Sequence, residues 1–319
     1  MTWIVGIDEA GYGPNLGPFV MSMVAVRVPE ADAPADLWDR LKGAVRRAEG
    51  TNDGRLVIDD SKRVHIPGNG VGPLERTLYG FLWNAVGTPC PLARHWREYC
   101  STPFKQLQAE PWYEDGCTLP ACNPPDDWPT ARTQLETTCR DASVEFCDFR
   151  SVVVFPRQFN ELVTKHDSKA AVPAWGLKQL LRKLPRRGGG QPTRVHVDKL
   201  GGRDFYAALL QDIFPEHMVL CRREGASESS YRASGTAGEL DITFQPEADR
   251  RHLPVALASM LSKYLREVLM EMFNRFWQKQ VPGVKPTAGY PGDSRRFYDD
   301  IREARERLGI PHEVLWRER

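Results

Sequence analysis

The chain begins with two apolar runs, residues 3–7 and 19–28, that enclose two adjacent carboxylates and a glycine-rich turn. The first run leads directly into Asp8 and Glu9, and the turn follows at residues 10–14. Both runs have the composition of buried strands, so they predict a hairpin-like start. Carboxylates at the end of a buried strand are costly unless something neutralises them, and a divalent cation is the usual partner. This segment therefore predicts a metal site beside a loop that exposes its backbone.

Composition places the chain among globular proteins, because 41% of its 319 residues are hydrophobic. The 43 Lys and Arg residues nearly balance the 42 Asp and Glu residues, so any nucleic-acid surface must be local. No apolar run is long enough to span a bilayer, and the first strand begins at residue 3, so we expect a cytoplasmic protein without a signal peptide. Seven cysteines, an odd number, favour reduced thiols over a disulfide framework.

Strand and helix patterns recur along most of the chain and predict an α/β architecture in a single domain. Strands are expected at residues 151–155, 194–197, 218–223, 229–233 and 240–244, and helices at residues 34–49, 74–86, 175–184 and 254–277. Residues 87–148 differ, because prolines are frequent there, periodicity is poor and six of the seven cysteines fall within them. We interpret this segment as an insertion, and we expect a C-terminal extension from about residue 278.

Acidic residues stand where strands end or a helix begins. Asp8 and Glu9 end the first strand, Asp198 ends another, and Asp249 lies just before the long helix. Such points gather at one edge of an α/β sheet, so the four carboxylates could hold two Mg²⁺ ions, which activate a water and stabilise the leaving oxygen of a phosphodiester. The alternative is that each acid is a turn or capping residue.

A glycine pattern in the same region suggests a second kind of site. Gly11, Gly13 and Gly17 follow a strand, as they do in dinucleotide-binding turns. Pro14 and Pro18 do not suit the helix that such a turn requires, and two carboxylates would face the pyrophosphate. We therefore favour the metal site over the dinucleotide site.

Basic residues cluster locally in residues 178–203, where eight Lys or Arg stand against one acid, Asp198. A local positive face of this kind can follow phosphates along a nucleic acid. The alternative is an ordinary solvated helix face.

Five motifs, in order, resemble those of the type 2 ribonucleases H, the ribonuclease HII family. Residues 6–18 (GIDEAGYGPNLGP) are similar to its opening motif, usually written Asp-Glu-Ala-Gly followed by Arg-Gly-Pro and a later Gly-Pro. The others are Asp60-Ser61-Lys62, Val197-Asp198, Ala248-Asp249 with the helix from Val255 to Lys263 and Arg266, and Gly289-Tyr290-Pro291-Gly292-Asp293. The resemblance spans residues 4 to about 293.

The resemblance implies a ribonuclease H-like fold with a mixed central sheet flanked by helices. It also implies an endonuclease that cuts the RNA strand of an RNA/DNA hybrid or a ribonucleotide-containing DNA duplex, leaving a 3′-hydroxyl and a 5′-phosphate. Its cofactors would be Mg²⁺ or Mn²⁺ in a two-metal site, and we expect a monomer.

The resemblance further assigns expected roles to residues. The catalytic, metal-binding acids would be Asp8, Glu9, Asp198 and Asp249. Gly11 and Gly13 would present backbone groups to the ribose 2′-hydroxyl, which distinguishes RNA from DNA. Further substrate contacts are expected from Tyr290 on a neighbouring sugar, from Lys62 on a phosphate, and from Ser259 and Lys263 near the backbone of the cut strand. The alternatives are that Lys62 lies in a solvated turn and that Ser259 packs within its helix.

Two features depart from the family pattern. Tyr12 stands where the family has Arg, and it either contacts a base or sugar or packs internally. This departure and the large insertion motivate a second functional hypothesis, a hybrid-binding protein without cleavage or a nuclease of the same fold retuned to another nucleic acid. The cysteines of the insertion, with four residues between Cys117 and Cys122, could hold zinc or could be buried thiols.

Overall fold

A seven-stranded mixed sheet forms the centre of the computed structural model, which describes residues 1–318 except 34, 50–52, 66–69, 83–89, 115, 123–126, 183, 185–189 and 237. The sheet order is β7-β2-β1-β8-β11-β10-β9. The strands are β1 (Thr2–Ala10), β2 (Phe19–Val28), β7 (Glu145–Val154), β8 (Thr193–Asp198), β9 (Met218–Arg223), β10 (Ser229–Gly235) and β11 (Gly238–Gln245). β1 is parallel to β8 and β8 to β11, whereas the other neighbours are antiparallel. This arrangement confirms the predicted α/β class and agrees with the ribonuclease H-like fold that the resemblance implies.

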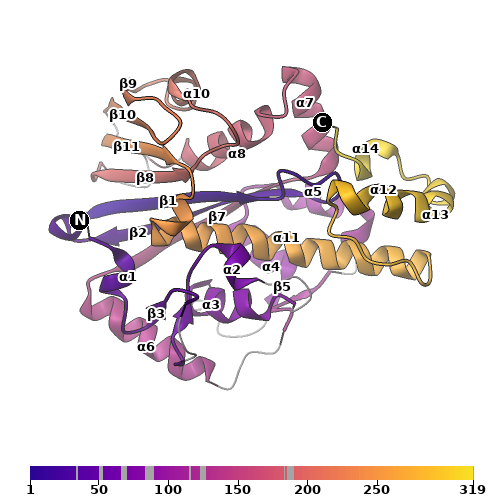
Figure 1. Cartoon of the computed structure of the whole chain (residues 1–319), viewed down its shortest axis with the longest axis horizontal. Coiled ribbons are helices and arrows are strands. Elements are labelled where there is room, and N and C mark those ends of the chain that lie inside the picture. The colour runs from indigo at the N-terminus through magenta and orange to yellow at the C-terminus, as the bar shows by residue number, and fades with distance from the viewer. Residues whose placement is uncertain are drawn as a thin grey trace.

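Alternating side chains of β1 and β2 build two cores, one on each face of the sheet. Ile4 and Val24 join the core that contains α11 (Leu253–Gln280), whereas Val5 and Met23 join the core that contains α8 (Ala171–Leu181). Figure 1 shows α11 along one face with α7, α8 and α10 on the other. Because both faces are covered, the central strands are apolar nearly throughout.

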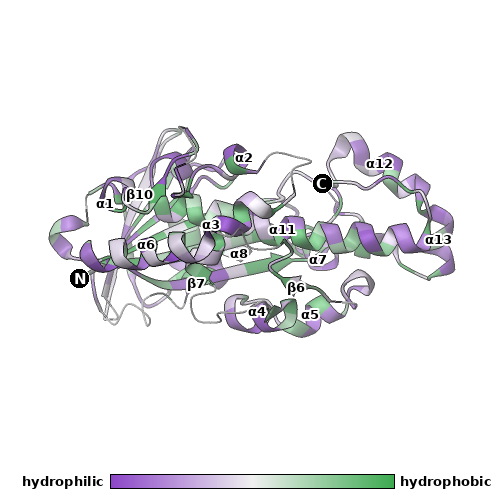
Figure 2. Cartoon of the chain, turned by 90° about the horizontal axis from the view of Figure 1, so that it is seen from below, coloured by the Kyte–Doolittle hydropathy of each residue, from purple (hydrophilic) through white to green (hydrophobic). Residues whose placement is uncertain are grey.

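The remaining helices and short strands surround these layers. On the α11 side lie η1 (Glu30–Asp32), α1 (Leu37–Arg40), β3 (Val45–Arg46), β4 (Leu56–Val57), α2 (Ser61–Val64) and α3 (Gly72–Leu82). On the other side lie α7 (Pro156–His166), α8 and α10 (Ala207–Ile213), and α11 is preceded by η4 (Ala248–Arg250). The C-terminal helices are α12 (Pro291–Asp300), α13 (Arg302–Arg307) and α14 (His312–Leu315). Many residues of α12 and α13 are hydrophilic (Figure 2).

Some element boundaries differ from the sequence-based expectations. The helix predicted at residues 34–49 is only α1 (Leu37–Arg40), because Gly43 is a weak helix former and the chain then turns into β3. The strand predicted from residue 151 begins at Glu145, because this part of the edge strand carries exposed polar side chains rather than an apolar run. The helix predicted at 74–86 is α3, and residues 83–86 lie outside the described part of the chain.

The segment predicted as an insertion is built from short elements that pack on the α11 side of the sheet. These are β5 (Cys90–Pro91), α4 (Leu92–Tyr99), α5 (Phe104–Gln108), η3 (Pro111–Tyr113), β6 (Thr118–Leu119) and α6 (Trp128–Asp141). Trp96 stacks on Phe155, and Trp112 meets Phe273 of α11 edge-on with ring centroids 5.1 Å apart. All seven cysteines of the chain are free. Within the described residues, no His, Cys, Asp and Glu side chains form a group that could hold zinc.

The buried histidine of α4 predicts a specific pH dependence of stability. His95 is 1% exposed, and burial lowers its pKa to about 4. In the unfolded chain the imidazole titrates near 6.5, so its contribution to folding is complete above that pH and is lost as the pH falls toward 4. We expect the free energy of unfolding to drop by about 2 kcal/mol between pH 7 and pH 5 from this group. Urea unfolding at both pH values should show a smaller drop for His95→Leu than for the wild-type protein.

The matched control for this experiment is His166→Leu, because His166 is exposed at the end of α7. The control should keep the wild-type pH dependence. An equal drop in the wild-type protein and in His95→Leu would contradict the assignment.

No helix among the described residues is long and apolar enough to cross a membrane.

Candidate active site

The four predicted acids gather at one edge of the sheet. Ile7 of β1 pairs with Val197 of the parallel strand β8, so the next residues, Asp8 and Asp198, lie side by side where the pairing of these two strands ends. Asp8 itself remains in β1, which continues to Ala10 and pairs there with β2. The backbone N–H of Ala248 donates to Asp198 Oδ1 at 2.9 Å, which ties η4 and its Asp249 to the end of β8. The fold therefore brings the end of the β1–β8 pairing and the start of α11 to the same edge of the sheet.

The helix α11 fixes Asp8 from the other side. Ser262 Oγ donates to the carbonyl oxygen of Asp8 at 3.0 Å, and a hydrogen bond from the Ser259 side chain lowers the pKa of the Asp8 carboxyl. Gly6 lies against the first turn of α11, where an added Cβ would stand 2.2 Å from the backbone of Pro254. The close contact between β1 and α11 thus sets the distance between Asp8 and the residues that begin the helix.

Burial and mutual repulsion raise the pKa values of the acids. Burial is the largest cause for Asp8, whose pKa lies well above its usual range, and Glu9, Asp198 and Asp249 raise it further. Burial and then Asp198 raise the pKa of Glu9 to about 8, and burial with Asp60 and Asp198 raises that of Asp249 to about 6. Such a cluster favours binding of cations, because a nearby positive charge would relieve both effects.

The Asp60-Ser61-Lys62 motif is brought to this cluster by α2. Asp60 caps α2 by accepting from the N–H of Lys62 at 2.9 Å, and the hydroxyls of Ser259 and Ser61 lie within hydrogen-bond distance, 3.1 Å apart. Lys62 lowers the pKa values of Glu9, Asp198 and Asp249, whereas Asp60 raises those of the two aspartates. Asp60 is thus a fifth acid of the cluster, a position that its Asp-Ser-Lys motif alone does not predict.

The chemistry of these donors fits a divalent cation. Carboxylate oxygens are the preferred ligands of Mg²⁺ and Mn²⁺, and within the described part of the chain the buried Glu9 Oε2 has no hydrogen-bond partner. In the same described residues, however, no three His, Cys, Asp or Glu side chains form a group that could hold a metal ion. The acids share one edge without converging on a point, so ion binding would require their side chains to turn toward it.

The loop between β1 and β2, residues 11–18, is called the glycine loop below. Gly11 has φ +83°, and a Cβ there would lie 2.6 Å from Arg266 Cδ, so both its conformation and its space require glycine. Asn15 N–H donates to Gly289 O at 2.8 Å, which joins the glycine loop to the Gly-Tyr-Pro motif. Tyr290 is 48% exposed, and an added Cβ on Gly13 would lie 4.0 Å from its ring. The two predicted substrate-contacting motifs therefore form one surface.

Tyr12 packs partly against the protein. Its ring meets Phe19 edge-on with centroids 6.3 Å apart, and Lys169 Nζ lies 4.9 Å from the ring centroid. Burial raises the pKa of the phenol, with a further rise from Glu9 and an opposing effect of Arg203. Tyr12 thus lies between the acid cluster and the loop that follows β8, and it packs in part, as one of the two alternatives expects. Contact of Tyr12 with a base or sugar stays a prediction.

Several predicted basic contacts are engaged by acids of the protein. Lys263 Nζ lies 2.7 Å from Glu267 Oε1 on α11, and Lys178 Nζ lies 2.6 Å from Asp212. Lys199 also forms an ion pair with Asp204. The predicted basic stretch at 178–203 is thus partly neutralised, and its residues 183, 186 and 187 lie outside the described part of the chain.

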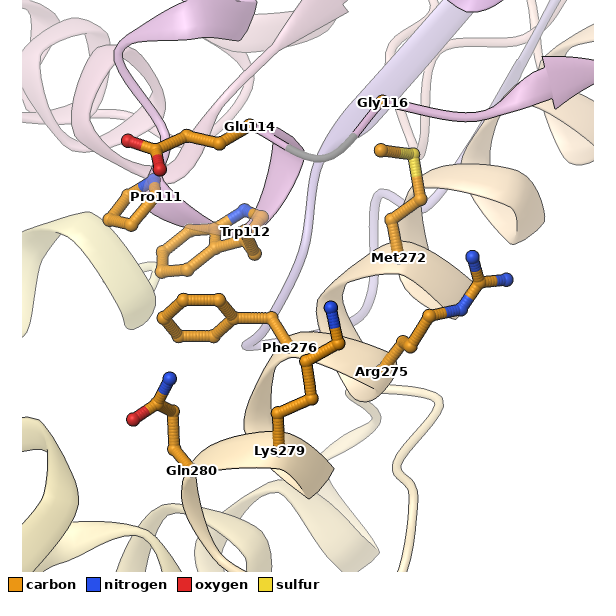
Figure 3. Close-up of a pocket in the computed structure, with 9 residues that line it drawn as sticks. All are labelled: Pro111, Trp112, Glu114, Gly116, Met272, Arg275, Phe276, Lys279 and Gln280. Atoms are coloured by element: carbon orange, nitrogen blue, oxygen red, sulfur yellow. The ribbon is translucent and has the colours of Figure 1, made fainter.

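A hollow away from the acids lies near the C-terminal end of α11 (Figure 3). Trp112 and Phe276 form its apolar side, and Arg275 and Lys279 lie at its edge. It shares no lining residue with the acid cluster, so we do not assign it to the active site.

No family model matches the sequence, and no curated protein matches it. Among solved structures, the chain is similar to ribonuclease H2 from Pyrococcus horikoshii OT3, with 15% identity over 98% of this chain and 92% of that one and a TM-score of 0.42. It is also similar to ribonuclease HII from Archaeoglobus fulgidus, solved as a complex with PCNA, at 14% identity, 99% and 94% coverage and a TM-score of 0.44. The chain is similar as well to Bst ribonuclease HIII in complex with Mn²⁺, with 15% identity over 99% of this chain and 66% of that one and a TM-score of 0.45. All three are ribonucleases H, but at this distance the likeness assigns no role to any residue.

Proposed function

We propose that this protein is a metal-dependent endoribonuclease that cuts the RNA strand of RNA/DNA duplexes, leaving a 3′-hydroxyl and a 5′-phosphate. The observation that carries the proposal is the cluster of Asp8, Glu9, Asp198 and Asp249, buried or half-buried beside the glycine loop. Four carboxyls with raised pKa values are costly to bury unless the site binds cations, and a protein that only recognised a duplex would not need them.

The acids would hold Mg²⁺ or Mn²⁺, which when bound would lower the pKa of a water and stabilise charge at the scissile phosphate. Lys62 would contact a phosphate, because it is the cation that acts electrostatically on three of the acids. Ser259 would position Asp8 and Ser61 rather than touch the strand directly, and Lys263 would reach a phosphate only by leaving Glu267.

Recognition of the duplex would come from the joined glycine loop and Gly-Tyr-Pro motif. The backbone of Gly11 and Gly13 would face the ribose 2′-hydroxyl, since neither residue carries a side chain that would block approach. The exposed ring of Tyr290 would pack on a neighbouring sugar.

The second candidate function is binding without cleavage, or cleavage of a different nucleic acid. It is favoured by Tyr12, whose ring packs between Phe19 and Lys169 at a position where the family pattern has Arg.

The test compares a long RNA/DNA hybrid with a DNA duplex that contains a single ribonucleotide, with Mg²⁺, Mn²⁺ or a chelator. We expect metal-dependent cutting of at least one duplex, with a 3′-hydroxyl at the mapped cut. If neither duplex is cut with either metal, the proposed nuclease is wrong. A gel shift that persists in chelator, with no products when metal is restored, would favour the binding protein.

A further inference from the structure

The C-terminal tail, residues 316–318, packs against the glycine loop although about 300 residues separate them in sequence. Trp316 forms an antiparallel bridge with Leu16, and Arg317 N–H donates to Asn15 O at 2.8 Å. Asn160 of α7 also holds the tail, because its Nδ2 donates to Trp316 O at 2.8 Å. Figure 1 shows this end of the chain, beyond α14, next to α7.

From this tail, the guanidinium of Arg317 enters the glycine loop. Nη1 donates to Gly11 O at 2.7 Å, and Nη2 donates to Pro14 O. The side chain is 1% exposed and lies over the Phe159 ring, with Cζ 4.6 Å from the centroid. Both ends of the turn that contains Tyr12 and Gly13 are therefore held by one side chain.

This contact is unusual because a buried guanidinium normally has a carboxylate partner. Among the described residues, the recorded partners of the Arg317 side chain are loop carbonyls and an aromatic ring, and no acid forms an ion pair with it. A neutral apolar side chain would fill the same space without the cost of desolvating a charge. The charge is thus used to fix two backbone carbonyls of the loop.

Fixing these carbonyls bears on recognition because the Gly11 carbonyl belongs to the peptide that joins Gly11 to Tyr12, and the opposite side of that peptide would face the substrate. The N–H opposite the Pro14 carbonyl, that of Asn15, donates to Gly289 O and joins the loop to the Tyr290 motif. Gly11 is held between two arginines, Arg317 at its carbonyl and Arg266 at its Cα, where an added Cβ would stand 2.6 Å from Arg266 Cδ. Arg266 Nη2 also donates to Ala288 O at 2.7 Å, and Arg266 Cζ lies 5.6 Å from the Tyr290 ring centroid. The two arginines hold the ribose-facing loop and the Tyr290 motif in one fixed arrangement.

We propose that Arg317 is a positioning residue that holds the glycine loop in the shape needed to recognise a ribose, so that the C-terminal tail is part of the recognition site. The inference rests on the proposed nuclease function and adds the residue that orders its recognition loop. Loss of Arg317 would free the carbonyls of Gly11 and Pro14 and lower the preference for ribose-containing duplexes, while the acid cluster keeps its own supports from α11 and η4.

The experiment compares Arg317→Met and Arg317→Lys with the control Arg307→Met, which alters an exposed arginine of α13. Binding of an RNA/DNA hybrid and of an all-DNA duplex of the same sequence is measured without metal, and kcat and KM for the hybrid are measured with Mg²⁺. We expect Arg317→Met to lose about tenfold in the ratio of the two affinities, the effect of losing a charged hydrogen bond, and to change KM more than kcat. Arg317→Lys should lie between, and added methylguanidinium should restore part of the loss.

Hydrogen exchange of the full-length variants separates loop order from global stability. Peptides covering the glycine loop should exchange faster in Arg317→Met, whereas peptides covering β8 should not. An unchanged affinity ratio in Arg317→Met, or an equal loss in Arg307→Met, would overturn the proposal. If Arg317→Met does not fold, Arg317→Lys and its methylguanidinium response decide the question. If the wild-type protein neither cuts nor prefers the hybrid, the proposed function fails, and the exchange data still report whether Arg317 orders the loop.

Discussion

The change from Asp8 to Asn is expected to abolish metal-dependent cleavage and, in the absence of metal, to make the fold more stable. Asp8 lies at the centre of the acid cluster, and burial and three neighbouring acids raise the pKa of its carboxyl. A neutral amide of the same shape removes that repulsion and keeps an oxygen for the N–H of Glu9, which donates to Asp8 Oδ1 at 2.7 Å. It also removes a charge that a divalent ion would need. Opposite changes in activity and stability are the signature of a residue retained for function.

The measurement pairs product formation from the hybrid with thermal unfolding in chelator. We expect no products above background and a midpoint at least ~2 °C higher than wild type, the shift produced by about 1 kcal/mol in a chain of this size. The matched control is Asp212→Asn, which makes the same chemical change at a surface residue paired with Lys178. Asp212→Asn should retain wild-type cleavage. Cleavage by Asp8→Asn at the wild-type rate would refute the role of Asp8, and inactivity with a lower midpoint would point to a folding defect instead.

The convergence of the acids could be predicted from sequence because it depends on local rules. Carboxylates at corresponding positions of neighbouring parallel strands lie at the same edge of the sheet, so Asp8 and Asp198 are placed side by side where the β1–β8 pairing ends at Ile7 and Val197. Asp249 could be added because it precedes a long amphipathic helix. The glycine pattern could likewise be assigned to a loop rather than to a helix, because Pro14 and Pro18 exclude the helix.

Other parts of the site depend on contacts between distant segments, which leave no periodic signal. Arg317 is one arginine in a polar C-terminal stretch, and only the fold places it against the carbonyls of Gly11 and Pro14. Asp60 is expected only as part of a motif, and its cap of α2 and its effect on the pKa values of Asp198 and Asp249 appear only when α2 is placed beside α11. The basic run at residues 178–203 suggests more free positive charge than the fold leaves. Lys178 and Lys199 form ion pairs with Asp212 and Asp204, which lie beyond the run in the sequence.

The contact between β1 and α11 gives the second large prediction, for Gly6→Ala. Gly6 is two residues before Asp8, and an added Cβ would lie 2.2 Å from Pro254 C and from Val255 N. These are backbone atoms at the start of α11, so they cannot move aside as a flexible side chain could. We expect α11 to shift away from β1 and the free energy of unfolding to fall by about 3 kcal/mol, the upper part of the usual range for overpacking. Urea unfolding measures this loss.

The matched control for the added methyl group is Gly202→Ala, because no heavy atom lies within 4 Å of a Cβ at Gly202 and its backbone is not left-handed. Its stability should stay within about 0.5 kcal/mol of wild type. Equal stability of Gly6→Ala and wild type would show that the close approach of β1 and α11 is absent in solution. Where Gly6→Ala is still folded, kcat for the hybrid should also fall, because Asp8 moves with β1 whereas Ser259 moves with α11. A variant with lower stability but unchanged kcat would mean that the acid cluster tolerates a displaced helix, so the distance set by this glycine would matter to folding alone.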